Sequence, residues 1–252
     1  MVRSRFERGS GSGSWIGARA APGALALVAT LGLLFLALVV MPESLRGWVG
    51  QHLALIPRRG IGREPWQIAT AGFFHFSLSA LVGSLISIWV FGTAIEQRIG
   101  RQRMWLLFGA AQLAGMLTMG LAGLVLGPEG TREPLVSPGV LVGFSGALAG
   151  AAGLIGAFGV HYGPVPLRLF GAIEMRGRTL ALFVLGVSVV SGLVHHDWVL
   201  AIGEIVGALC GWTIATGRGL DLATAWHRLH LWRLRRRYKV IPGGRDSKRY
   251  LN

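Results

Sequence analysis

Six long apolar stretches constrain the fold of this chain more than any other feature of its sequence. They occupy residues 24–41, 68–95, 104–127, 136–160, 179–194 and 198–217. A helix needs about 17 to 25 apolar residues to cross a bilayer. Lipid offers no hydrogen bonds to an exposed backbone, and the alternation typical of a membrane barrel is absent from the sequence. The stretches therefore predict an all-α membrane protein with six transmembrane helices.

The composition agrees with a lipid environment. Hydrophobic residues make up 52% of the 252 residues, and charged residues only 14%, which is unusual for a soluble domain. Cys210 is the only cysteine, so no internal disulfide can form. Cys and His residues do not recur at the spacing of a metal site. We therefore expect neither a metal nor another cofactor.

A net charge of +14 would suggest nucleic acid binding in a soluble protein, but the positions of the basic residues argue against it. Of the 25 Lys and Arg residues, 20 lie in the N-terminal arm, the loops 96–103 and 161–178, and the C-terminal tail. The loops 42–67, 128–135 and 195–197 hold the other five. The positive-inside rule then places both termini in the cytoplasm. We expect a multi-pass protein of a bacterial inner membrane, without a nucleic acid partner.

The apolar stretches divide the chain into three parts. These are a cytoplasmic arm (1–23), a membrane domain (24–217) and a basic cytoplasmic tail (218–252). The arginines of the arm would also suit a cleavable signal peptide, but the apolar run after them is long and no small-residue cleavage site follows it. In the tail, apolar residues recur at helical spacing among arginines, which predicts a surface helix that binds anionic lipids. A solvated tail is the alternative.

Two glycine motifs lie in the predicted fourth and sixth helices. Gly143 and Ser145 belong to a G-x-S-G motif, which is expected several residues inside an apolar helix. Gly203, Gly207 and Gly211 form a repeated G-x-x-x-G motif, which lets a neighbouring helix approach the backbone closely. Small residues beside a serine occur wherever membrane helices pack tightly. Either motif alone is therefore generic.

A third group of residues makes these motifs informative. It comprises Trp66, Thr70 and His75, then the run Trp89-Val90-Phe91-Gly92, then Glu96 followed by Gly100. Together with the two glycine motifs, in this order, the string resembles the rhomboid intramembrane serine proteases. The resemblance covers residues 66–217. It implies a six-helix rhomboid fold in which Ser145 occupies the position of the nucleophile.

The same alignment exposes departures at the positions that make the family's serine reactive. The catalytic histidine falls on Leu200, and the histidine and asparagine of the oxyanion site fall on Ala80 and Ser84. The aromatic residue that stacks on the catalytic histidine falls on Ala149, and the loop arginine on Gln67. A serine without a base is a poor nucleophile, and an oxyanion needs donors that alanine lacks. The expected function is a rhomboid-like pseudoprotease that binds or regulates transmembrane clients.

An active intramembrane serine endopeptidase is the alternative function. His196 lies four residues before Leu200, on the same helix face and about 6 Å away along the axis. A shifted sixth helix would bring this imidazole towards Ser145 as a non-standard base. The simpler interpretation of His196 is a polar residue in an outer turn.

Glu204 is the one acidic residue in the middle of the predicted sixth helix. An ionisable group inside a membrane costs free energy and is often functional. No basic residue lies within the apolar stretches to pair with it, so burial predicts its neutral form. Ser145, Ser84 or a trapped water are its expected partners, and a structural link to neighbouring helices is the simplest role. A proton-linked transporter is a third function, but the sequence shows no inverted repeat.

Overall fold

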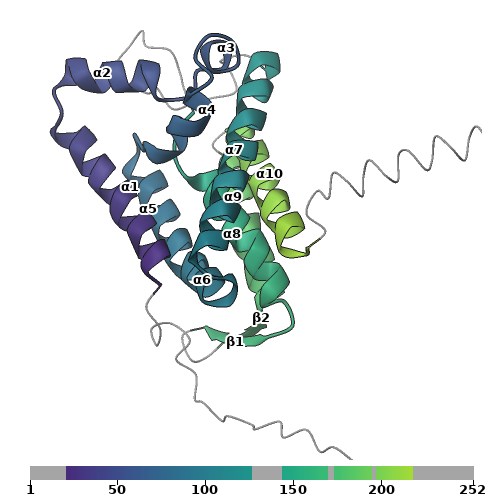
Figure 1. Cartoon of the computed structure of the whole chain (residues 1–252). Helices are drawn as coiled ribbons and strands as arrows, with labels where there is room; N and C mark the ends of the chain where they lie inside the picture. The colour runs from purple at the N-terminus through teal and green to yellow at the C-terminus, as the bar shows by residue number, and fades with distance from the viewer. Residues whose placement is uncertain (1–20, 127–143, 170–172, 195–196, 218–252) are drawn as a thin grey trace, which may run out of the picture. The chain divides into compact units, whose positions relative to one another are not determined.

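The computed structural model describes residues 21–126, 144–169, 173–194 and 197–217 (Figure 1). Its elements in chain order are α1 (Pro22–Val40), α2 (Glu43–His52), α3 (Pro57–Gly60), α4 (Gln67–Thr70), η1 (Ala71–Phe73), α5 (Leu78–Ser87), η2 (Ile88–Gly92), α6 (Thr93–Ile99), α7 (Arg101–Leu126), α8 (Leu148–His161), β1 (Pro166–Leu169), β2 (Ile173–Arg176), α9 (Gly177–Val194) and α10 (Trp198–Ala215). The predicted tail helix, Gly143, His195 and His196 lie outside the described residues.

Within the described residues, four helical segments are long and apolar enough to cross a membrane. They are α1, the continuous segment made of α5, η2 and α6, then α7, and finally α10. Two further apolar helices, α8 and most of α9, are shorter. These helices confirm the predicted all-α membrane fold. The described residues also contain an antiparallel hairpin of β1 and β2, in a loop that the sequence analysis left without structure.

The second transmembrane segment begins later than residue 68, where the sequence analysis placed it. The spanning helix starts at Leu78 and is preceded by the short helices α4 and η1. Thr70 accounts for part of this difference, because its hydroxyl donates to the Leu53 carbonyl at 2.9 Å and ties α4 to the loop after α2. A run that looks apolar in sequence is thus partly a folded loop.

The fourth helix is also shorter than predicted, since α8 begins at Leu148. Every residue of α8 from Ala149 to Gly159 is buried. The helix packs against α5, α7, α9 and α10, so it forms the centre of the bundle. Its small side chains let several helices reach it at once.

The glycine motif of α10 makes the close approach that its sequence predicts. A Cβ atom built on Gly207 would overlap the backbone of Ala149 in α8, and one on Gly211 would overlap the backbone of Gly153. A Cβ atom on Gly203 would instead overlap the Met119 side chain of α7. Two of the three glycines therefore bring α10 into backbone contact with α8.

Candidate functional site

Ser145 lies immediately before α8, not several residues inside a helix as its motif predicted. The preceding residue, Phe144, forms a β-bridge with Leu55, with backbone N–H to O distances of 2.8 and 2.9 Å. Gly146 follows with φ of +102°, a left-handed conformation that favours glycine. The bridge and the left-handed glycine keep the chain out of a helix until Leu148. The Ser145 side chain is partly exposed at this turn.

The two backbone N–H groups that follow Ser145 both donate to acceptors within the protein. Gly146 N–H donates to the Ala71 carbonyl at 2.9 Å, and Ala147 N–H donates to His75 Nε2 at 3.1 Å. Within the described residues, the Ser145 hydroxyl has no hydrogen-bond partner. Among the described residues, the serine of this turn therefore contacts no base, and the two amides beside it are already engaged.

His75, which the sequence suggested only as part of a motif, contacts the serine turn. It is 1% exposed, and its Nε2 also lies 3.1 Å from the Ser84 hydroxyl. Because Nε2 accepts from Ala147, the hydrogen-bond network assigns the proton of the neutral ring to Nδ1. Nδ1 has no partner with good geometry among the described residues. Burial lowers the pKa of His75 to about 4, and the Phe73 backbone offsets only part of this effect.

Acidification is expected to destabilise the fold through His75. An unfolded histidine takes up a proton near its ordinary pKa of 6.5, whereas the folded one does so only near 4. The unfolded state binds more protons between these values, so stability falls as the pH drops from 6.5 to 4, by about 3 kcal/mol. Thermal unfolding in detergent at pH 7.5, 6 and 4.5 measures the loss. His75→Gln should lose less stability than the wild type over this pH range. An identical pH dependence of stability in both proteins would contradict the assignment of the effect to His75.

Gln112 is a second residue that the sequence analysis did not select. It lies in α7 and is 5% exposed. Its Nε2 donates to the Gly146 carbonyl at 3.0 Å, and its Oε1 accepts from Gly150 N–H at 2.8 Å. One amide thus fixes the turn around Ser145 and the first turn of α8. A lone glutamine in the middle of an apolar helix was the signal that could have identified it.

The structure describes each position at which the resemblance predicts a missing catalytic group. Ser84 is fully buried and bonds His75, while Ala80 on the same helix has no polar group to offer. Leu200 packs against an apolar cluster that includes Phe144 and Ala149, the residues one before and four after Ser145. Its role as the position of a lost histidine stays a prediction.

Glu204 bonds a different residue from those expected. Its carboxyl accepts from the Ser188 hydroxyl of α9 at 2.7 Å, and its side chain is buried with only 4% exposed. Neither Ser145 nor Ser84 bonds it among the described residues. The expectation of a link between helices agrees with this contact, which joins α10 to α9. His196, the other polar candidate, lies outside the described residues.

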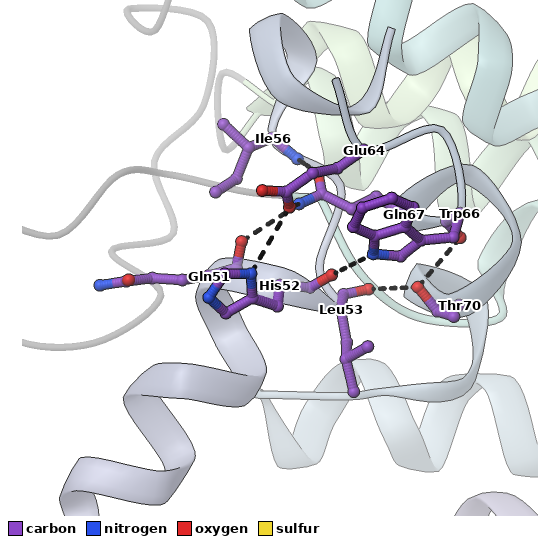
Figure 2. A network of polar contacts seen from close by, with 8 residues as sticks. All are labelled: Gln51, His52, Leu53, Ile56, Glu64, Trp66, Gln67 and Thr70. Carbon is purple, nitrogen blue, oxygen red and sulfur yellow. Dashed lines mark hydrogen bonds and ion pairs between the residues drawn. The ribbon is translucent and has the colours of Figure 1, made fainter. Parts of the chain in front are cut away.

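A polar network fixes the loop between α2 and α5, as Figure 2 shows. Gln67 is fully buried at the centre of this network. Its Nε2 donates to the Gln51 carbonyl at 3.1 Å and to Glu64 Oε2 at 2.6 Å. Its Oε1 accepts from Ile56 N–H at 2.9 Å. Trp66 Nε1 donates to the carbonyl of His52 at 3.1 Å. Gln67, which stands at the family's arginine position, thus serves as a structural residue of this loop.

The described residues hold no group of three or more His, Cys, Asp or Glu side chains arranged to bind a metal ion. Residues 62–219, which are more than half of the chain, match the family model of the Rhomboid domain. A comparison with curated proteins gives no match.

Proposed function

The chain belongs to the rhomboid family, and we propose that it is an inactive member that binds or regulates the transmembrane segments of other membrane proteins. The observation that supports this function best is the apolar surrounding of Leu200. That residue packs against a buried cluster that contains Phe144, Ala149, Met116 and Met119. A general base at position 200 would have to occupy a region that is lined by hydrocarbon and sulfur.

A serine hydroxyl needs a base within hydrogen-bond reach before it attacks a peptide bond. Leucine at position 200 cannot accept a proton. The buried carboxyl one turn further along α10, Glu204, already accepts from Ser188. Ser145 is thus expected to keep its proton at neutral pH and to remain unreactive.

The described donors near Ser145 are also not free to stabilise an oxyanion. A single oxyanion donor is worth about 2.7 to 4 kcal/mol of transition-state stabilisation. Gly146 N–H and Ala147 N–H donate elsewhere, to Ala71 and to His75. Ser84 bonds His75 as well, so the remaining hydroxyl near the turn is also engaged.

Ala149 gives a steric reason why a catalytic histidine could not be held in place. In an active site of this kind an aromatic ring at that position would orient the imidazole. Here Ala149 is fully buried, a Cβ atom on Gly115 of α7 would overlap its methyl group, and a Cβ atom on Gly207 would overlap its backbone. Helices α7 and α10 therefore occupy the space that a larger side chain would need.

Two helices could receive a client helix. Both α5 and α9 pack against α8, and both present large exposed apolar side chains. Those on α5 include Val82 and Ile86, and those on α9 include Phe183 and Val187. Such faces suit lipid or another transmembrane helix, because dispersion and close packing drive association inside a bilayer.

The decisive test is covalent labelling of Ser145. Purified full-length protein in detergent is treated with a fluorophosphonate or an isocoumarin, and the bound label is quantified by mass spectrometry. Because no described residue offers the serine a base, labelling of the wild type is expected to equal that of Ser145→Ala. A transmembrane reporter should likewise remain uncut. Labelling that depends on Ser145 would refute the inactive assignment.

Active intramembrane proteolysis is a second candidate function, and one observation favours it. The neutral ring of His75 contacts the peptide that follows Ser145. Its unprotonated nitrogen would have to exchange the Ala147 N–H for the serine hydroxyl in order to act as a base. If the wild type cleaves a reporter, loss of cleavage in His75→Gln would identify His75 as the base. Loss of cleavage in His196→Gln would instead identify His196.

We further propose that both termini face the cytoplasm of a bacterial cell, on the strength of the 20 to 5 distribution of basic residues. In a variant without Cys210, Thr131→Cys is expected to react with an impermeant thiol reagent added outside intact spheroplasts. Arg237→Cys is expected to react only after the membrane is opened. The reverse pattern would contradict the topology.

A further inference from the structure

A pocket of roughly 530 Å³ lies where α1 and α7 begin. Its lining includes Pro22, Ala26, Arg101, Trp105 and Leu106. Figure 1 shows that α1 leaves this end of the bundle and reaches α2 at the opposite end, beside the loops that carry α3 and α4. The turn that holds Ser145 is bridged to Leu55, in the loop after α2, so it lies towards that opposite end and away from the pocket.

The lining changes from charged to apolar along the helix axes. Arg101 is the first residue of α7, and Trp105 lies four residues later, about 6 Å deeper at the rise of an α-helix. Ala26 lies equally far beyond Pro22 in α1. Leu106, which is 73% exposed, continues the apolar side of the pocket. A cation at the rim, an indole below it and hydrocarbon deeper down complement, in order, the phosphate, the glycerol esters and the acyl chains of an anionic phospholipid.

The charge at this rim is positive. Arg101 makes neither a hydrogen bond nor an ion pair with any described residue. Arg98, three residues earlier in sequence, is exposed as well. Glu96 is the acidic side chain closest to the floor, but it is 7% exposed and its two oxygens already accept from backbone amides of α1. The exposed groups of the rim therefore favour an anion.

We propose that this pocket binds one anionic glycerophospholipid. Arg101 contacts the phosphate, Trp105 lies at the level of the glycerol esters, and an acyl chain runs over Ala26 and Leu106. A soluble phosphate would use the arginine but leave the apolar lining uncovered. The site does not depend on whether Ser145 is active, because the two lie at different ends of the bundle.

Native mass spectrometry of the full-length protein in a neutral detergent tests the site. Dioleoyl phosphatidylglycerol is titrated, with dioleoyl phosphatidylcholine as the uncharged comparison, and the first lipid adduct gives an apparent Kd. Arg101→Gln removes the cation, and Ala26→Trp fills the apolar part without changing the charge. Both positions are exposed, so folding should be retained. Arg103→Gln is the matched control, because it removes the same charge from the same helix outside the pocket.

Phosphatidylglycerol is expected to bind more tightly than phosphatidylcholine. Arg101→Gln should weaken it about fivefold, the effect of one basic residue beside an anionic lipid, and Ala26→Trp by at least as much. Arg103→Gln should change it less than twofold. Equal losses for Arg101→Gln and Arg103→Gln, or no effect of Ala26→Trp, would overturn the proposal.

Two other occupants give distinct results. Displacement of the lipid by millimolar inorganic phosphate would show a simple anion site and overturn the lipid assignment. If only a variant lacking residues 1–18 binds lipid, the N-terminal arm occupies the pocket in the intact protein, and the proposal is wrong.

Discussion

Gly211→Leu is expected to lower the thermal stability of the membrane domain by about 10 °C or to prevent folding. A Cβ atom at this position would overlap the carbonyl group and Cα of Gly153 in α8. Backbone atoms in the centre of a packed bundle cannot move aside as a flexible side chain can. Overpacking of this kind costs about 3 kcal/mol or more, which corresponds to roughly 10 °C in a domain of this size.

The matched control is Gly186→Leu in α9, since a Cβ atom there meets no atom within 4 Å. That variant should unfold at the wild-type temperature. The alanine pair sharpens the test: Gly211→Ala should already be destabilised by its Cβ, whereas Gly186→Ala should be neutral or slightly stabilised by its higher helix propensity. Melting of Gly211→Leu together with the wild type would mean that α10 does not approach α8 as described.

Glu96→Leu is expected to release α1 from the bundle and to destabilise the protein by about 3 kcal/mol. Glu96 lies in α6, and its two oxygens accept from Gly23 N–H at 2.9 Å and from Ala24 N–H at 2.7 Å. These are first-turn amides of α1, which has no side-chain cap of its own. The negative charge of the carboxylate also interacts favourably with the positive end of the α1 dipole.

Leucine would remove both acceptors and leave two buried donors unpaired. Glu96→Gln keeps one acceptor oxygen and loses the charge, so it should cost about half as much. Arg98→Gln, an exposed change in the same helix, should have little effect. Chemical unfolding in detergent gives the stabilities, and limited proteolysis before α2 reports release of α1. Equal stability of Glu96→Leu and Glu96→Gln would exclude the two-bond cap.

Several features of the fold could be predicted because they depend on residues close in sequence. Apolar length predicted the membrane helices, and the four-residue spacing of Gly203, Gly207 and Gly211 predicted a face that approaches another helix. The spacing of Glu96 and Gly100 was recognised as a motif. Gly100 has φ of +87° and ends α6, which is a local requirement that only glycine meets easily.

The site depended on contacts between residues far apart in sequence. Ala147 N–H meets His75 across 72 residues, and Gln112 meets Gly146 across 34. No periodicity encodes such pairs, because they follow from how α5, α7 and α8 pack. For the same reason, the motif that contains Glu96 could not predict that this side chain caps α1.

The sequence by itself determined that this chain folds as a membrane bundle of the rhomboid type, and the resemblance predicted that Leu200 stands where the family has its base. Only the tertiary structure decided where Ser145 lies, namely in a turn before α8, and which groups hold that turn. The physical reason is that burial and helix length depend on local composition. The hydrogen-bond partners of Gly146 and Ala147, in contrast, are chosen by the three-dimensional approach of Ala71, His75 and Gln112.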